Sequence, residues 1–247
     1  MTDRLRETLA DAGRVLAMEG HGDYVAGHIS VRLPEDSGRF LMKPAGIGIE
    51  EMRPDNIITV DIEGKKIDGT MPRHNEVFIH SEVLRARRDV NAVVHTHPIH
   101  AVAFSSLGKP LVAVGNDASP FVGNLPIFDE TTDLIVDQAR GRAVARCLGD
   151  RAALILRNHG IVTAAASIEE AVWVALKLEK ACRMQLLAEA AGGPKLTVEG
   201  DDLKKKSRRS NRGDLHVNVF NYLVRRWRCI CCGEQVDAPQ VETFEGG

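Results

Sequence analysis

Short β-type runs separated by turn residues restrict the fold of this chain more than any other feature of its sequence. Four such runs, ISVRL, RFLMK, IITVDI and KKI, lie within residues 29–67, and segments that contain glycine or proline separate them. Runs of this length that are joined by short turns are typical of antiparallel strands. The pattern therefore predicts a mainly antiparallel sheet near the start of the chain.

Helical patterns precede and follow these strands. Residues 3–19 carry an apolar stripe at helical spacing that stops at Gly20. A helix is expected to open at Pro72, because proline is tolerated in a first helical turn. A capping box at residues 167–170 begins a long helix that ends at the glycines and proline of residues 192–194. Strands combined with helices of this kind predict an α/β fold.

The middle of the chain is expected to alternate between the two kinds of element. A helix begins near Pro98, and Thr132 caps another helix that ends at Gly149. The remaining apolar runs of this region are predicted to be strands, at residues 90–96, 111–114, 154–156 and 161–164. The last two strands enclose the turn at residues 157–160.

The sequence predicts one domain followed by an extension. With 44% hydrophobic and 27% charged residues over 247 positions, the chain has the composition of a globular protein, and residues 1–193 form one compact domain. Residues 194–247 contain a basic run at 204–212 and an apolar, aromatic stretch at 216–227. We interpret this extension as an exposed arm and a docking segment, and not as an independent domain.

Charge and hydropathy indicate which partners to expect. The formal net charge is -2, and the basic run is short and lacks interleaved aromatic residues, so we expect no nucleic-acid partner. No apolar run reaches the roughly 18 residues of a membrane helix, and the N-terminus lacks the apolar core of a signal peptide. We therefore expect a cytoplasmic protein without a membrane partner, which acts on a small molecule.

The five cysteines do not form an evenly spaced framework, so structural disulfides are not expected. Cys229 and Cys232 make a C-x-x-C pair around Cys231. One such pair, without a second pair of histidines or cysteines, does not complete a structural zinc site. We assign no role to these three residues.

Histidines form the strongest chemical signal in the sequence. His95 and His97 stand two positions apart on a predicted strand, so their imidazoles project from the same face and can share one ion. An open metal site needs more donors, which His159 in a tight turn and Glu76 near the start of a helix supply. This set suits Zn²⁺, Mn²⁺, Fe²⁺ or Co²⁺. The alternatives are solvated histidines at a strand end and, for Glu76, a carboxylate that stabilises the helix dipole.

At these residues the chain resembles the class II aldolase/adducin family. The resemblance covers about residues 1–193 and rests on five motifs in order: AGHISVR at 26–32, KPAG at 43–46, Glu76, HTHP at 95–98 and NHG at 158–160. It implies a three-layer α/β fold with a central, mainly antiparallel sheet flanked by helices, and a homotetramer with sites at subunit interfaces. It also implies that His95, His97 and His159 hold one divalent metal ion per subunit, with Glu76 as an acid/base that can join the ligands.

Three positions depart from the pattern of the family's sugar-phosphate members. Those members carry an asparagine, a Thr-Gly pair and paired serines that together hold a phosphate, whereas this chain has His28, AG at 45–46 and RHN at 73–75. The guanidinium of Arg73 suits a carboxylate, and the imidazoles of His28 and His74 can hydrogen-bond a second carboxylate or a ring hydroxyl. We therefore predict that a planar di- or tri-acid is bound by His28, Gly46, Arg73, His74 and Asn75.

At these positions the chain most resembles the family's decarboxylases of hydroxylated aromatic or pyridine dicarboxylates, such as a dihydroxyphthalate. The resemblance implies a metal-dependent carboxy-lyase of aromatic catabolism, because loss of CO₂ and aldol cleavage both leave an enolate that a metal ion stabilises. One alternative is a class II aldolase or related lyase that cleaves a hydroxy-keto acid or a sugar phosphate. The other is a non-enzymatic module like adducin, against which the three histidines argue, since adducin-type proteins lack them.

Two further residues are candidates for the site, and the proton donor stays open. Either Glu76 or a water on the metal ion would protonate the ring carbon that loses CO₂. His80, one helical turn beyond Glu76, can orient that carboxylate, although a histidine satisfied on a helix face is an equal interpretation. Tyr222 can reach a neighbouring subunit's site, as a C-terminal tyrosine does in aldolase relatives, although packing of a terminal helix is the simpler interpretation.

Overall fold

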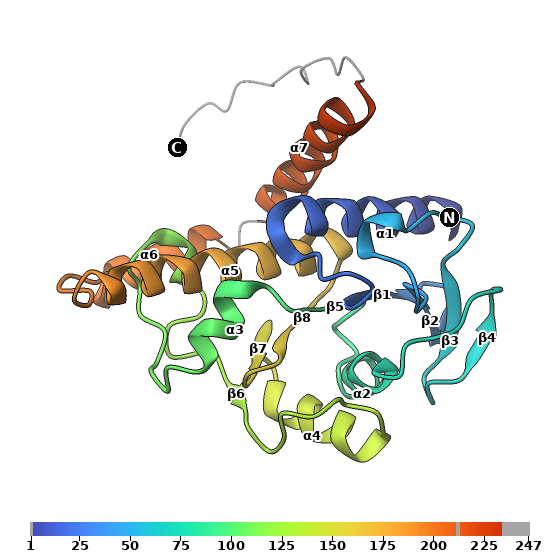
Figure 1. Cartoon of the computed structure of the whole chain (residues 1–247), viewed down its shortest axis with the longest axis horizontal. Helices are drawn as coiled ribbons and strands as arrows, with labels where there is room; N and C mark the ends of the chain where they lie inside the picture. The colour runs from blue at the N-terminus through green and yellow to red at the C-terminus, as the bar shows by residue number, and fades with distance from the viewer. Residues whose placement is uncertain (1, 211–212, 234–247) are drawn as a thin grey trace.

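An eight-stranded sheet runs through the centre of the protein (Figure 1). The computed structural model describes residues 2–210 and 213–233. The strands follow the spatial order β4-β3-β2-β1-β5-β8-β7-β6, and neighbouring strands are antiparallel except for β6 and β7. Their bounds are β1 His28–Leu33, β2 Asp36–Met42, β3 Ile58–Asp61, β4 Lys66–Asp68, β5 Ala92–Thr96, β6 Ile127–Phe128, β7 Ala153–Leu156 and β8 Gly160–Ala165. The predicted α/β class and mainly antiparallel sheet are confirmed.

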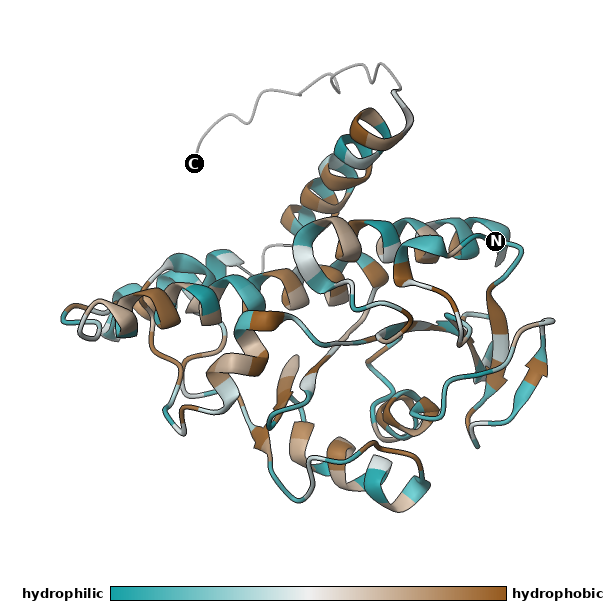
Figure 2. Cartoon of the chain, in the orientation of Figure 1, coloured by the Kyte–Doolittle hydropathy of each residue, from teal (hydrophilic) through white to brown (hydrophobic). Residues whose placement is uncertain are grey.

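Helices cover both faces of the sheet and make three layers. α1 (Thr2–Leu16), α3 (Ile99–Ser105) and α5 (Ile168–Ala190) share one apolar cluster with the sheet, whereas α2 (Val77–Ala86) and α4 (Gln138–Leu148) share another. Figure 2 shows apolar residues gathered where the helices meet the sheet. Three short helical turns complete this part of the chain: η1 (Ala17–His21), η2 (Ile49–Glu51) and η3 (Asn116–Ala118).

Alternation along two central strands decides which side chains reach which layer. In β5, Val94 lies in the cluster with α1 and α5, whereas Val93 lies in the cluster with α2 and α4. Because side chains alternate along a strand, His95 points to the same face as Val93, toward α2. β1 pairs with β5 so that His28 lies opposite His95 and Ser30 lies opposite Val93. The sheet therefore brings polar residues of both strands to its α2 face.

The helix that we expected to open at Pro72 begins at Val77 instead. Residues 72–76 stay irregular because their backbone is bonded elsewhere: the Pro72 carbonyl accepts a hydrogen bond from Ala45 N at 2.8 Å. Glu76 consequently occupies the cap position before α2, and its side chain makes no capping hydrogen bond. The carboxylate of Glu76 therefore does not serve as a helix cap.

The start of α4 also differs from the prediction. The helix begins at Gln138, where the Asp137 side chain accepts a hydrogen bond from Arg140 N. Thr132 does not cap it, because the chain between Thr132 and Asp137 runs without helical structure. This loop contains Ile135, whose backbone N–H donates a hydrogen bond to the Glu76 carboxylate.

Residues 111–114 do not form the expected strand. Val112 N donates to Gln185 Oε1 at 2.8 Å, and the Ala113 carbonyl accepts from Val198 N at 2.9 Å. These backbone groups are bonded to α5 and to the segment that follows it, so they do not pair with a strand of the sheet. The short strand β6, in turn, was not predicted, because two residues carry no periodicity.

The C-terminal extension is helical where the structure describes it. α6 (Gly200–Ser210) takes the place of the expected arm at 204–210, although none of its residues is buried, and residues 211–212 lie outside the described part. In α7 (Gly213–Cys232), Phe220 and Leu223 are buried in the cluster of α1 and α5. No helix among the described residues is both long and apolar enough to cross a membrane.

Candidate metal centre

Four ligand candidates converge at one end of the central strands. His95 is the second-last residue of β5, and His97 directly follows the strand's last residue, Thr96. His159 lies in the turn between β7 and β8, the strand that pairs with β5. Glu76 reaches the same point from the cap position of α2. One ligand atom from each residue lies within 4.8 Å of all the others, as a single metal ion requires.

The distances within this cluster are short and mostly involve Nε2 atoms. His95 Nε2 and His97 Nε2 are 3.1 Å apart. Glu76 Oε2 lies 3.8 Å from His95 Nε2, and Glu76 Oε1 lies 3.6 Å from His159 Nε2. The structure therefore brings together the four residues that the sequence predicted as ligands.

The hydrogen bonds that His95 and His97 make through Nδ1 determine the protonation of Nε2, the nitrogen that faces the cluster. His95 Nδ1 lies 2.9 Å from the Ile161 carbonyl, which can only accept, so Nδ1 carries the ring proton. His97 Nδ1 lies 2.8 Å from the Asp23 carboxylate and is a donor for the same reason. In the neutral rings both Nε2 atoms are then unprotonated, and two lone pairs face each other across 3.1 Å. Such an arrangement fits a cation between them.

The remaining two candidates support the same fit. His159 Nε2 is buried and has no hydrogen-bond partner within the described part of the chain. Glu76 is 8% exposed, and its Oε1 accepts a hydrogen bond from Ile135 N at 2.9 Å. A metal ion would satisfy the orphaned nitrogen and the second oxygen of this carboxylate.

Burial sets the protonation of these groups. It lowers the pKa of His159 to about 4 and the pKa of His95 well below its usual value, which keeps both imidazoles neutral and able to bind a metal ion. Burial also raises the pKa of Glu76, an effect that the hydrogen bond from Ile135 opposes. A carboxyl group with a raised pKa is suited to carry a proton at a higher pH than an exposed glutamate.

Sequence reasoning missed two residues that hold the ligands in place. Asp23 bonds to His97 as described, and His21 Nδ1 lies 2.9 Å from Oγ1 of Thr96, which stands between His95 and His97. His21 ends η1, and Asp23 follows in the loop that precedes the AGHISVR motif. Their nearness to the motif is a weak signal, but the contacts themselves join residues about 75 positions apart, which no local pattern reveals.

Two of the predicted substrate residues, His28 and His74, lie beside the cluster. The ring centroid of His28 is 4.6 Å from that of His74 and 4.9 Å from that of His95. His74 Nε2 lies 3.1 Å from both the Pro44 carbonyl and Lys43 Nζ, and burial lowers its pKa to about 4. His28 and His74 therefore continue the row of imidazoles from the cluster of ligand candidates toward the loop after β2.

The spacing of His80 and Glu76 suggested that the imidazole orients the carboxylate. Among the described residues, however, His80 makes its hydrogen bonds to other partners. Its Nε2 lies 2.6 Å from His28 Nδ1, and its Nδ1 lies 2.6 Å from Ser30 Oγ. Both ring nitrogens are therefore in use, and the ring is fully buried. His80 is connected to the cluster through His28.

The other predicted substrate residues are less enclosed. Arg73 Nη1 donates to the His74 carbonyl at 2.8 Å, and its guanidinium lies 5.6 Å from the centre of the Phe78 ring. Asn75 is exposed, and Gly46 adopts a φ of +87° in the turn after β2, a conformation that favours glycine. Tyr222 is 53% exposed on α7. No contact among the described residues joins Asn75, Gly46 or Tyr222 to the four ligand candidates.

A cavity of about 480 Å³ opens next to the cluster, so a small molecule can reach it. Polar and apolar side chains share its lining, which includes Asp23, His97, Asn158, His159, Ile99 and Leu134. Ile99 is 75% exposed and Leu134 is 47% exposed, so the mouth of the cavity is apolar. An aromatic ring is suited to such a mouth, with its polar groups directed at the histidines.

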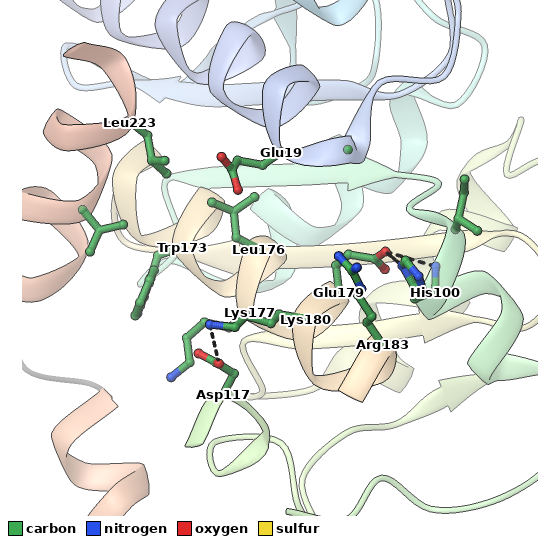
Figure 3. A pocket seen from close by; sticks show the side chains of 13 residues that line it. Glu19, His100, Asp117, Trp173, Leu176, Lys177, Glu179, Lys180, Arg183 and Leu223 are labelled. Atoms are coloured by element: carbon green, nitrogen blue, oxygen red, sulfur yellow. Dashed lines mark hydrogen bonds and ion pairs between the residues drawn. The ribbon is translucent and has the colours of Figure 1, made fainter. Parts of the chain in front are cut away.

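A second cavity, of about 420 Å³, lies between α5 and α7 (Figure 3). Its charged groups are largely paired: His100 Nδ1 is 2.5 Å from Glu179 Oε1, and Lys180 Nζ is 3.0 Å from Asp117 Oδ2. None of the four ligand candidates lines it. Of these two cavities, the first is therefore the one that ligand candidates line, namely His97 and His159.

Comparison with known proteins agrees with the fold. Residues 7–186 match the model of the Class II Aldolase and Adducin N-terminal domain. Decarboxylase NovR of Streptomyces niveus is 35% identical over 174 residues, which cover 70% of this chain and 64% of that protein. The 3,4-dihydroxyphthalate decarboxylase of Arthrobacter keyseri is 32% identical over 209 residues, which cover 80% of this chain and 84% of that protein.

A solved structure shows the same architecture over nearly the whole chain. The L-fuculose 1-phosphate aldolase of Glaciozyma antarctica PI12 superimposes with a TM-score of 0.83 at 30% identity, and the match covers 95% of this chain and 92% of that chain. Because the family model spans most of the sequence, this chain belongs to the class II aldolase/adducin family.

Proposed function

We propose that this member of the class II aldolase/adducin family is a metal-dependent decarboxylase of a hydroxylated aromatic or pyridine dicarboxylate. The observation that carries the proposal is the row of imidazoles in which His28 lies between His74 and His95, at centroid distances of 4.6 and 4.9 Å. The rings of His28 and His74, together with Arg73, take the place of the groups with which sugar-phosphate members hold phosphate. Two of the relatives described above are decarboxylases, which supports the same reaction.

The proposed ligands are His95, His97, His159 and Glu76. A divalent ion bound there, whether Mn, Zn, Fe or Co, would stabilise the negative charge that develops on the substrate oxygen next to the breaking bond. The protein's own part is to present three imidazoles, of which the Ile161 carbonyl orients that of His95 and the Asp23 carboxylate orients that of His97.

Glu76 is the proposed proton carrier. When the carbon–carbon bond to the departing carboxylate breaks, CO₂ leaves and its bonding electron pair stays on the ring carbon. Glu76 then transfers its proton to that carbon and becomes a carboxylate. Burial, which raises the pKa of Glu76, favours the protonated form that this step needs. His28, His74 and Arg73 would hold the carboxylate that remains on the ring.

An aldol cleavage is the second candidate, because the structural match described above is to a sugar-phosphate aldolase and covers 95% of this chain. The same ligands and the same Glu76 would serve it. The two candidates differ in what the neighbouring groups must bind, which is a carboxylate for the decarboxylase and a phosphate for the aldolase. Imidazoles packed in a buried row favour the flat, carboxylated ring.

A substrate panel decides between the two reactions. We expect the metal-loaded protein to release CO₂ from hydroxyphthalates or hydroxypyridine dicarboxylates, and to stop when a chelator removes the metal ion. Fuculose 1-phosphate and ribulose 1-phosphate, tested in parallel, should not be cleaved. Cleavage of a sugar phosphate without any turnover of a diacid would overturn the decarboxylase in favour of the aldolase.

We further infer a cytoplasmic homotetramer with sites at subunit interfaces, built from a catalytic domain, residues 1–193, and a C-terminal arm and docking segment, residues 194–247. Exposed apolar side chains support the assembly: Tyr24 is 90% exposed and Ile99 75% exposed beside the site, and Tyr222 and Ile230 are exposed on α7. Light scattering at micromolar concentration tests the assembly. A fully active monomer would contradict it.

A further inference from the structure

Three buried side chains form a hydrogen-bonded row behind the metal-ligand cluster. Ser30 Oγ is 2.6 Å from His80 Nδ1, and His80 Nε2 is 2.6 Å from His28 Nδ1. The exposed fraction is 0% for Ser30 and His80 and 1% for His28, so bulk water does not compete for these groups. The remaining nitrogen of His28, Nε2, faces Glu76 Oε2 at 3.8 Å.

The serine decides the direction of these hydrogen bonds. Among the described residues, His80 Nδ1 is the one hydrogen-bond partner of Ser30 Oγ. A buried hydroxyl proton without an acceptor is costly, so Ser30 donates and His80 Nδ1 accepts. A neutral imidazole carries one proton, which in His80 must then be on Nε2. His80 therefore donates to His28 Nδ1.

The same argument continues into His28. Its Nδ1 accepts from His80, so the single proton of a neutral His28 lies on Nε2, the atom that faces the site. Burial lowers the pKa of His80 to about 3 and the pKa of His28 well below its usual value, in agreement with neutral rings. His28 is thus an N–H donor toward Glu76, whereas His95, which lies opposite it in the sheet, presents a lone pair.

We propose that Ser30 and His80 hold His28 as an N–H donor that binds an anionic oxygen of the substrate, and that they keep His28 out of the set of metal ligands. The identity of that oxygen, a carboxylate or phenolate of the diacid, rests on the proposed function. Ser30 and His80 act through His28 and are positioning residues. Neither nitrogen of His28 is available to a metal ion, because one carries the proton and the other accepts from His80.

A metal-binding experiment tests the second half of the proposal without any turnover. The probe is Co²⁺, measured by its stoichiometry per chain and by its visible absorption spectrum in the resting protein. We expect His28→Ala to bind as much Co²⁺ as the natural protein with the same spectrum, whereas His95→Ala loses the ion. Loss of Co²⁺ or an altered spectrum in His28→Ala would show that His28 is a ligand and would overturn the assignment.

A binding experiment tests the first half. The probe is 3,4-dihydroxyphthalate, and its dissociation constant is measured by calorimetry on the metal-loaded protein. Ser30→Ala should weaken binding by about tenfold, since it removes the donor that fixes the His80 and His28 tautomers. Ser30→Thr keeps a hydroxyl and should restore binding to within about twofold of the natural protein. Equal affinities for Ser30→Ala and the natural protein would contradict the proposal.

Ser81→Ala is a matched control. Ser81 is fully buried on α2 next to His80, yet its hydroxyl has no hydrogen-bond partner within the described residues. Its replacement should leave both probes unchanged, and a tenfold effect there would assign the Ser30→Ala result to packing. If the natural protein binds no dihydroxyphthalate, the substrate part fails together with the proposed function, while the Co²⁺ result still decides whether His28 is a ligand.

Discussion

Two groups of histidines meet in this protein, and they differ in what their second ring nitrogen contacts. In the ligand group, His95 and His97 donate from Nδ1 to a carbonyl and a carboxylate, so their Nε2 atoms are lone pairs. In the donor group, His28 and His80 accept at Nδ1, so their Nε2 atoms carry protons. The rings of His28 and His95 are only 4.9 Å apart. The chemistry of an imidazole is therefore set by its far partner and not by its position alone.

The two groups also differ in access to the open cavity, which His97 and His159 line and which neither His28 nor His80 lines. The ligand group lies where β5 ends and where a turn joins β7 to β8, beside an open cavity. The donor group lies between the sheet and α2, where Ser30 and His80 are fully buried. Removing a member of one group should thus have consequences that differ in kind from removing a member of the other.

The largest effect is expected from His95→Ala in the ligand group. It removes one of three imidazoles, so the protein should lose stoichiometric metal and its turnover should fall by about 10³-fold, as expected for several kcal/mol of lost charge stabilisation. Elemental analysis and CO₂ release measure the two outcomes. His100→Ala is the control, because His100 is paired with Glu179 and is not a ligand candidate. Full metal occupancy in His95→Ala would contradict the assignment of His95 to the ligand group.

Glu76→Gln should lower kcat by about 10²-fold, because the amide keeps the shape of the side chain but cannot carry a proton. KM should change little, since the donor group stays intact. Steady-state kinetics on the diacid check both values. A rise in KM with unchanged kcat would mean that Glu76 binds substrate and does not transfer a proton.

Asp23→Asn tests whether the residue bonded to Nδ1 sets the role of an imidazole, because it changes the partner of His97 Nδ1 and keeps all four ligand candidates. An amide can donate to His97 Nδ1 and so allow the wrong tautomer, which places the ring proton on the metal side. Metal affinity should fall by about 10–100-fold, as for other groups that orient metal ligands. A competition titration with a chelator measures it. Unchanged affinity would show that the Asp23 contact at 2.8 Å does not set the tautomer.

Much of the ligand group was predictable from the sequence, whereas the residues that bond to the Nδ1 atoms of the histidines were not. The spacing of His95 and His97 fixes a shared face, and the turn around His159 is visible as NHG between two apolar runs. The donor to His80 is Ser30, 50 positions away, and the orienting group of His97 is Asp23, 74 positions away. Those contacts follow from strand register and loop conformation, which local patterns do not encode.

The fold shows the same division. The strands within residues 29–67 and the capping box before α5 were predictable, because each is determined by neighbouring residues. The late start of α2 was not, since it depends on the bond between Pro72 and Ala45. That error placed Glu76 inside a helix, whereas the residue lies at the cap position before α2.

Arg73→Ala extends the comparison to the outer part of the substrate site. The guanidinium is anchored to the His74 carbonyl, and its other N–H groups can bind a carboxylate. KM for the diacid should rise by about tenfold with little change in kcat, as expected for a lost charge-assisted hydrogen bond. Arg53→Ala is the control, because Arg53 is an exposed residue paired with Asp55. An unchanged KM would remove Arg73 from the site.

A further prediction concerns acid stability and a histidine of neither group. Burial lowers the pKa of His21 to about 3, against 6.5 for an exposed histidine. Below pH 6.5 the unfolded chain therefore takes up a proton that the folded protein does not, and stability falls by about 1.4 kcal/mol per pH unit until the pH nears 3. His21→Gln should flatten the fall of unfolding free energy by that slope. Denaturant titrations at several pH values measure it, and an unchanged slope would contradict the assignment.

The most direct test of the account is a crystal structure of the Mn²⁺-loaded protein with the metal located by anomalous scattering. We predict one ion, bound about 2.1 Å from the Nε2 atoms of the three ligand-group histidines, His95, His97 and His159. Nε2 of His28 should remain outside the coordination sphere, with Nδ1 still bonded to His80. An ion coordinated by His28, or one bound away from the ligand group, would contradict the division of the histidines on which the account rests.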